Sequence, residues 1–193
     1  MIRIINLFFI IFFLLSSKAY SLIEIDITRG NLDPLPIAVS PLFQDDSSKR
    51  NSINELKIEN VGSEISLVVE NNLKISGLFN PLSKEAFLQK PDIAHLKPRF
   101  EDWALIKAQA LITGKVTIED KKLKVEFRLW DILAGREMMA LAFTTVPSNW
   151  RRVGHIISDK VYERLTGEKG YFDTRIIYVS EEGPKTARVK KLA

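Results

Sequence analysis

The feature that most constrains the fold is the alternation of apolar and polar side chains between residues 110 and 145. In its middle, one strand face carries Leu123, Val125, Phe127 and Leu129, and these alternate with Lys124, Glu126, Arg128 and Trp130. A period of two residues is typical of a β-strand with one face on a core and the other nearer water. The turns at 119–122 and 131–135 are too short for a crossover helix. The stretch from Ala110 to Thr145 therefore predicts three strands paired antiparallel in sequence order.

Two segments have the three- and four-residue spacing of amphipathic helices. The first covers residues 63–74, and the second follows residues 147–149 and ends at Gly167, where a C-terminal glycine is favoured. Their apolar stripes consist of Ile65, Val68, Val69 and Leu73 in the first helix and of Val153, Ile156, Ile157, Val161 and Leu165 in the second. A shorter helix is expected at 100–109, with Trp103, Leu105 and Ile106 directed at the core.

Further strands are predicted at residues 36–43, 78–82 and 172–180. Pro81 places the strand at 78–82 at a sheet edge, because proline cannot donate a hydrogen bond to a neighbouring strand. The polar stretch at 44–54 is expected to be an exposed, mobile loop. The tail from 181 to 193 is polar, so we expect no partner strand for residues 172–180.

Residues 1–21 have the pattern of a secretory signal peptide. Arg3 precedes an apolar run from Ile4 to Leu15, which is shorter than the ~20 apolar residues of a bilayer-spanning helix. Small residues allow cleavage after Ala19 or after Ser21, and an uncleaved anchor is the alternative. Either outcome predicts export, and the absence of cysteine means that an exported chain folds without disulfides.

The remaining residues offer no constellation for catalysis. His95 and His155 have no second ligand at metal spacing, and no nucleophile elbow or phosphate-binding loop occurs. Adjacent carboxylates occur at 45–46, 101–102 and 181–182. Each pair lies in a predicted loop or helix start, where a solvated charge or pairing with the helix dipole is expected rather than acid/base catalysis. Without the leader, 26 basic residues face 24 acidic ones, which is too even for nucleic-acid binding to be argued from charge. The sequence thus predicts no enzyme, no catalytic residue, no cofactor and no metal site.

The residues directly after the leader alternate, with Ile23, Ile25 and Ile27 between Glu24, Asp26 and Thr28. An edge strand of the domain and a mobile arm that pairs with a partner protein both fit this pattern.

An ordered set of short motifs resembles the TolB family, periplasmic proteins of the Tol-Pal envelope system. The motifs are Ser76–Leu82, Thr113–Val116, Phe127–Asp131 with Ala134-Gly135, Asn149–Arg152, Gly154-His155, Ser158-Asp159, Tyr162–Gly170, Thr174–Ile176 and Tyr178–Ser180. The resemblance covers residues 22–193, and the run through Lys169-Gly170 is its most specific part.

The resemblance implies an α/β fold in which a mixed β-sheet with an antiparallel meander is flanked by helices, similar to anticodon-binding domains. It implies a signal peptide at 1–21 cut after Ser21, an arm at 22–33, an α/β domain at 34–168 and the start of a truncated β-propeller at 169–193. The resemblance also implies a periplasmic, non-enzymatic component of the Tol-Pal system. Such a protein would link inner- and outer-membrane partners and serve outer-membrane integrity and constriction during cell division.

The arm would engage a TolA-like inner-membrane protein through Leu22, Ile23, Glu24, Ile25, Asp26, Ile27, Thr28, Arg29 and Gly30. A Pal-like lipoprotein would bind only if the propeller were present, and neither nucleic acid nor a small-molecule substrate is expected. Two alternatives stay open, a nucleic-acid-binding domain of anticodon-binding-like fold and a non-functional gene fragment.

Overall fold

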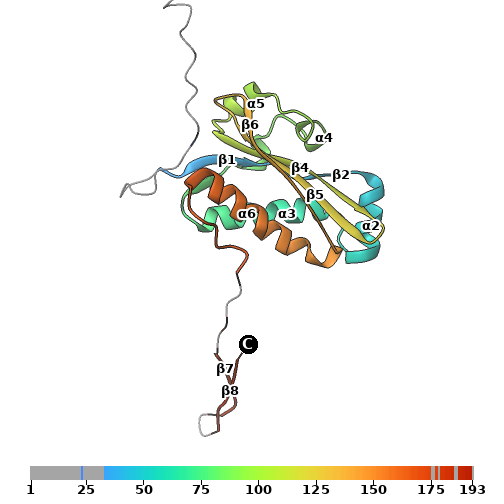
Figure 1. Ribbon diagram of the computed structural model, residues 1–193, viewed down its shortest axis with the longest axis vertical. Coiled ribbons are helices and arrows are strands. Elements are labelled where there is room, and N and C mark those ends of the chain that lie inside the picture. The colour runs from blue at the N-terminus through green and yellow to red at the C-terminus, as the bar shows by residue number, and fades with distance from the viewer. Residues whose placement is uncertain (1–22, 24–32, 175–176, 178, 185–186, 193) are drawn as a thin grey trace, which may run out of the picture.

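The computed structural model describes residues 23, 33–174, 177, 179–184 and 187–192 (Figure 1). The main body is a mixed, six-stranded sheet in the order β3-β1-β4-β5-β6, in which β2 also pairs with β4. The elements are β1 (Leu35–Val39), β2 (Phe43–Gln44), α2 (Asp46–Leu56), α3 (Val61–Ile75), β3 (Phe79–Pro81), η1 (Lys84–Ala86), α4 (Pro91–Ala94), α5 (Phe100–Leu105), β4 (Ala110–Glu119), β5 (Lys122–Asp131), β6 (Arg136–Thr145), η2 (Pro147–Asn149), α6 (Trp150–Thr166), β7 (Val179–Glu182) and β8 (Val189–Leu192). The predicted fold class is confirmed.

The predicted meander is present as β4, β5 and β6, which pair antiparallel in sequence order. Asp120 and Lys121 form the first turn with φ of 49° and 57°, the left-handed conformation that a tight two-residue hairpin requires at both positions. A register shift at Leu129/Trp130 leaves one extra residue in β6, so that Met138 and Met139 both contact the core. The strand pairing predicted from the alternating residues and the short turns is therefore confirmed.

The parallel half of the sheet was less predictable. The single strand expected at 36–43 is two strands, β1 and β2, separated by Pro41 and both parallel to β4. Between them, the Leu42 backbone N–H leaves the sheet and donates to Ser66 Oγ of α3 at 2.9 Å. Pro81 lies in β3, which is the sheet's edge as predicted, because β3 pairs with β1 alone on this path.

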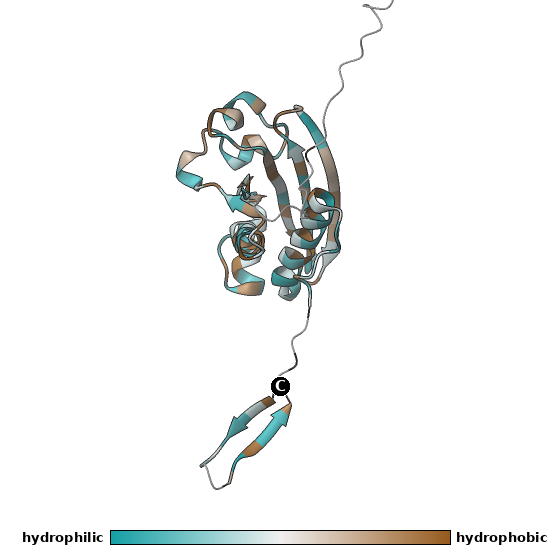
Figure 2. Ribbon diagram, turned by 90° about the vertical axis from the view of Figure 1, so that its left-hand side faces the viewer, coloured by the Kyte–Doolittle hydropathy of each residue, from teal (hydrophilic) through white to brown (hydrophobic). Residues whose placement is uncertain are grey.

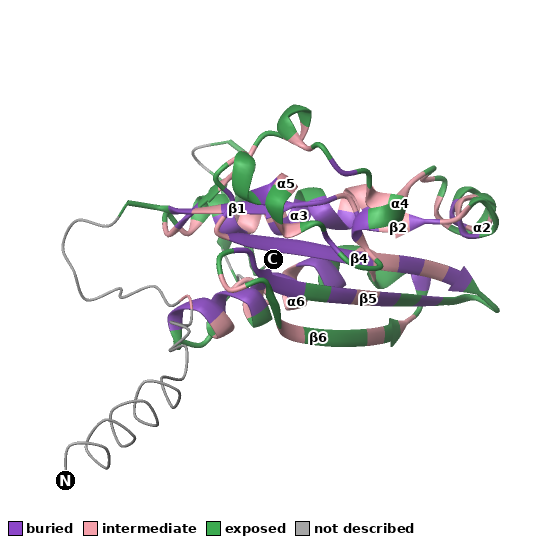
Figure 3. Cartoon of the chain, turned by 90° about the horizontal axis from the view of Figure 1, so that it is seen from above, coloured by how far each residue is buried: buried purple, intermediate pink, exposed green. Residues whose placement is uncertain are grey.

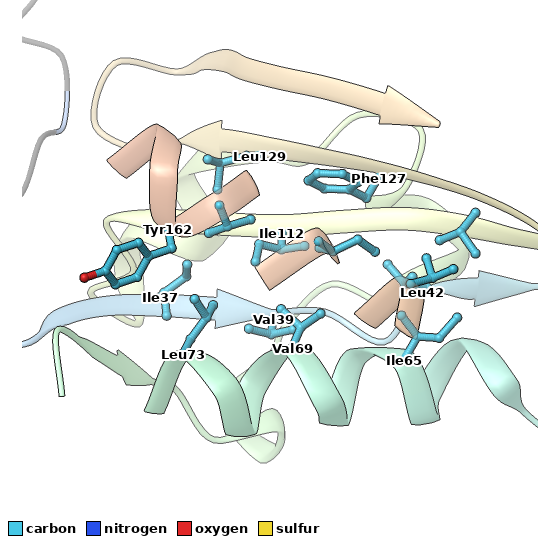
Figure 4. Packing of buried hydrophobic residues seen from close by; sticks show 14 of the residues in the cluster. Ile37, Val39, Leu42, Ile65, Val69, Leu73, Ile112, Phe127, Leu129 and Tyr162 are labelled. Carbon is cyan, nitrogen blue, oxygen red and sulfur yellow. The ribbon is translucent and has the colours of Figure 1, made fainter. Parts of the chain in front are cut away.

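Helices α3 and α6 cover one face of the sheet, and their predicted apolar stripes, apart from Val68 and the half-buried Ile156, form the main core with it (Figure 4). Ile65, Val69 and Leu73 of α3 and Val153, Ile157, Val161 and Leu165 of α6 are buried against the sheet. The two helices touch at Gly154, where a Cβ would lie 2.8 Å from Val68 Cγ1. Figure 2 shows that hydrophobic positions are concentrated in the central strands. The absence of a side chain at Gly154 therefore permits this close approach of the two helices.

The other face of the sheet carries a second, smaller core below α4 and α5. Trp130, expected on the face nearer water, is only 8% exposed, and its Nε1 donates to Thr113 Oγ1 at 2.8 Å. Trp103 is buried as predicted, but the prediction for Leu105 is wrong, since its side chain is 75% exposed. The helix ends at Leu105, and Ile106 packs against this core instead.

The polar stretch predicted to be a mobile loop is largely helix α2. The Asp45 carboxylate caps its start by accepting the Ser48 backbone N–H at 2.8 Å. Ser48 Oγ accepts the Ile118 N–H at 3.2 Å, and Asn51 Nδ2 donates to the Ile118 carbonyl at 2.7 Å. These side chains satisfy the backbone of β4 beyond the end of β2, so a polar helix is held by hydrogen bonds where apolar periodicity is absent.

The prediction for the C-terminal segment is wrong in two respects. The strand expected at 172–180 is formed by residues 179–182, and it has an antiparallel partner, β8, with Glu181 paired to Lys190. Opposite charges also link the hairpin, because Glu181 accepts from Arg188 and Lys190 at 2.7 and 3.0 Å. The polar tail therefore contains a strand stabilised by cross-strand ion pairs rather than by apolar burial.

Candidate interaction surface

The arm predicted to bind a partner falls almost wholly outside the described residues. Of Leu22 to Gly30, only Ile23 is described, and its partly buried side chain packs against the main core. The other eight residues, and the predicted signal peptide at 1–21, lie outside the described part of the chain. The binding role of the arm stays a prediction, and the structure adds only that Ile23 contacts the domain.

Both histidines make structural contacts. The His95 ring stacks on Phe43 with centroids 4.5 Å apart, and its Nδ1 lies 3.0 Å from the Pro91 carbonyl oxygen. Asn72 Nδ2 of α3 donates to His155 Nδ1 at 2.9 Å, which joins α3 to α6. Across the described residues, no group of three His, Cys, Asp or Glu side chains could hold a metal ion. These positions account for both histidines without catalysis.

The adjacent carboxylates also have structural partners. The backbone N–H of Ser48, then the Ser47 hydroxyl, lower the pKa of Asp45 to about 2, with a smaller contribution from Lys115. Asp102 pairs with Arg99, and hydrogen bonds from Lys190 and Arg188 lower the pKa of Glu181. Each pair therefore contains a carboxylate that stabilises local structure in its ionised form.

A polar clamp, which sequence reasoning did not find, fixes the chain where it leaves α6. The two oxygens of Asp159 accept the backbone N–H groups of Phe172 at 2.6 Å and Asp173 at 3.1 Å. Arg152 donates through Nε and Nη2 to the Asp173 carboxylate. Gly170 lies so close to Asp159 that a Cβ there would overlap it. The paired residues are 13 to 21 positions apart in the chain, and no local pattern connects them.

Aromatic side chains pack beside this clamp. The Tyr162 ring lies 5.5 Å from that of Tyr171 and 5.9 Å from that of Phe172, in edge-to-face arrangements. Burial raises the pKa of the Tyr162 hydroxyl. Residues 170–173 are thereby held on the domain by both polar and apolar contacts, so the direction in which the chain leaves the domain is defined.

Two grooves border strand β6, one on each face of the sheet. The larger, of about 630 Å³, lies on the face opposite α6 and is lined by His95, Leu96, Lys115, Arg128, Ala140 and Ala142, among others. The smaller, of about 260 Å³, lies between β6 and α6 and is lined by Phe143, Thr145, Asn149, Arg152 and Ile156, among others. These grooves lie on either side of the outer edge of β6.

None of the helices described is both long and apolar enough to cross a membrane.

Comparisons with protein families and with individual proteins point to the same family. The family model for the TolB amino-terminal domain matches residues 23–138. The chain is 77% identical over 185 residues to the Tol-Pal system protein TolB of Pelagibacter ubique, a match that covers 96% of this chain and 42% of the relative.

Among solved structures, TolB from Acinetobacter baumannii is similar with a TM-score of 0.60 at 24% identity, over 76% of this chain and 32% of that chain. At this identity the likeness supports the fold alone. The chain spans less than half of the length of the curated relative that it matches.

Proposed function

Since the chain belongs to the TolB amino-terminal domain family, we propose that it is a non-enzymatic, periplasmic component of the Tol-Pal system. The observation that carries the proposal is the 77% identity to a Tol-Pal TolB protein over nearly the whole chain. The secretory pattern of residues 1–21, with cleavage after Ser21, supports the periplasmic location. The structural contacts of both histidines and of the adjacent carboxylates support a role in binding rather than in catalysis.

The proposed organisation has an arm at 22–33, the α/β domain at 34–168 and a segment from 169 onwards that belongs to a propeller. The arm, through Leu22 to Gly30, binds a TolA-like inner-membrane protein. Binding of a Pal-like lipoprotein belongs to the propeller of the longer relatives. In this arrangement the domain supplies a rigid body between the arm and the clamp at Asp159, and the linked partners serve outer-membrane integrity and constriction during division.

A binding measurement with the carboxy-terminal domain of a TolA-like protein tests the arm. Calorimetry would compare the unaltered chain with a chain that lacks residues 22–30, and we expect the deletion to abolish measurable binding. A finer variant, Ile25→Asp with Ile27→Asp, keeps the length of the arm and removes two of the three isoleucines of its apolar face, so we expect it to weaken binding strongly.

The matched control is Ile75→Asp, because Ile75 is 80% exposed at the end of α3 and its change should leave binding intact. Circular dichroism and thermal melting would show that all variants are folded. Equal affinity of the deleted and the unaltered chain would refute the role of the arm.

A further inference from the structure

The two edges of the sheet are built differently. Edge β3 has three residues, Phe79–Pro81, and includes a proline. Edge β6 has ten residues, Arg136–Thr145, and contains neither proline nor glycine. From Met138 to Trp150 the sequence carries no charged side chain. Figure 3 shows β6 mostly exposed beside the buried strands β4 and β5.

A long edge strand with no charged side chain after its first two residues is unusual, because its outer row of backbone N–H and C=O groups can pair with any extended chain. Natural proteins shorten such edges or place proline or lysine on them, as β3 illustrates. In the part of the chain that the structure describes, no strand pairs with the outer edge of β6. The edge therefore has the properties of a site for β-strand addition.

The surroundings of β6 indicate which side chains an added strand would carry. Side chains of an extended segment alternate between the two faces of a sheet, and β6 has a groove on each face. The floor of the larger groove is formed partly by Ala140 and Ala142, whose small side chains leave room for a neighbour. Small or β-branched residues of an added strand would fit on this face.

Charge indicates what lies at the two ends of the added strand. Arg136 opens β6, and Arg151 stands in the first turn of α6 after the strand. Both are exposed, and within the described residues neither forms an ion pair, although Arg151 lies 4.8 Å from the Trp150 ring centroid. A second copy of this chain, paired antiparallel along β6, would bring Arg136 of one copy towards Arg151 of the other. The charges therefore disfavour a second copy and favour carboxylates.

We propose that the outer edge of β6 binds an extended segment of another protein, with an uncharged centre of small or β-branched residues and carboxylates at both ends. The segment adds as a further antiparallel strand of the sheet. The residues that form this edge differ from those of the arm proposed at Leu22 to Gly30.

A synthetic peptide of about twelve residues provides the probe, with two glutamates at each end and alternating valine and threonine between them. Titration into the full-sequence chain, labelled with ¹⁵N, should shift the backbone amides of β6 and leave those of α3 unchanged. The same peptide methylated on alternate backbone nitrogens keeps its side chains but cannot form the strand ladder. Equal binding of both peptides would overturn the proposal.

A charge exchange tests the ends of the strand. The double variant Arg136→Glu with Arg151→Glu should bind the glutamate peptide about tenfold more weakly, since each exposed charge pair contributes modestly, and it should bind a lysine-ended peptide more tightly. Ala140→Asp should abolish binding of both peptides, whereas Ile75→Asp on the remote end of α3 serves as control.

Two other results would also overturn the proposal. Concentration-dependent dimerisation that Ala140→Asp removes would assign the edge to a second copy. Protection of β6 amides in the peptide-free chain, lost on deletion of residues 24–32, would assign it to the chain's own arm.

Discussion

The contact of α3 with α6 at Gly154 allows a quantitative prediction for Gly154→Ala. A Cβ at this position would lie 2.8 Å from Val68 Cγ1, 2.9 Å from Val68 Cβ and 3.4 Å from the Ile65 carbonyl oxygen. Val68 is β-branched and has essentially one rotamer in a helix, so it cannot turn aside. The two helices would have to move apart by several tenths of an ångström, against a core that both of them fill.

Two opposing terms decide the size of the effect. Alanine favours a helix interior over glycine by about 0.8–1.0 kcal/mol. Overpacking of a close contact costs about 1–3 kcal/mol. The net result is a destabilisation of about 0–2 kcal/mol, in contrast to the stabilisation that Gly→Ala would give on an open helix face.

Urea unfolding followed by circular dichroism measures the net change in the free energy of unfolding caused by Gly154→Ala. The propensity term is measured separately by comparing Lys160→Gly with Lys160→Ala, because Lys160 is exposed on the same helix and both variants lose the same ion pair with Glu163. The contact itself is tested by a double-mutant cycle with Val68→Ala, which removes Cγ1, the nearest of the atoms that the new methyl group meets, and keeps the Cβ at 2.9 Å.

In the Val68→Ala background, Gly154→Ala should lose part of its cost, because one of the two close contacts with residue 68 is gone, which gives a coupling free energy of about 0.5–1 kcal/mol. A stabilisation by Gly154→Ala equal to the difference at Lys160, with no coupling to Val68, would refute the close packing of the two helices.

Two further predictions concern polar contacts. Asp159→Asn should speed the hydrogen exchange of the Phe172 and Asp173 amides by about 10–100-fold, because hydrogen bonds to a charged acceptor contribute about 1.5–3 kcal/mol. NMR measures this exchange, and an unchanged rate would contradict the clamp. Asp45→Ala should cost about 1 kcal/mol near neutral pH through loss of the helix cap. Since the folded-state pKa of Asp45 is lowered from 3.8 to about 2, the stability that its carboxylate contributes is complete above pH 3.8 and is lost as the pH falls towards 2. The stability difference between Asp45→Ala and the unaltered chain, measured with urea, should therefore be smaller near pH 3 than near pH 7, and equal differences would contradict this.

Helix α2 shows where sequence reasoning fails. Its residues are polar, and local composition favours a loop. The helix is held by Ser48 and Asn51, which bond the backbone of Ile118 some 70 positions away. Such a partner exists only once β4 has formed, so the signal is absent from the local sequence. The same reason explains why the clamp between Asp159 and residues 172–173 was missed.

The two candidate interaction surfaces, the arm and the grooves beside β6, also differ in whether the sequence could reveal them. The arm was predicted from the sequence, and its binding role stays a prediction, because alternating residues next to a predicted cleavage site and a family resemblance are both linear features. The grooves on the two faces of β6 were not, since they bring His95 and Lys115 beside Ala140, and only folding places these residues together.

The sequence by itself determined the meander and the two long helices, because periods of two and 3.6 residues express whether neighbouring side chains reach a core. It also determined the end of α6, because Gly167 adopts the left-handed conformation, with φ of 75°, that is common after the last turn of a helix. The tertiary structure alone decided that β1 lies between β3 and β4, and that Trp130 is buried on the second face of the sheet. It alone left β6 as the long open edge. These features depend on contacts between distant segments, which no local pattern encodes.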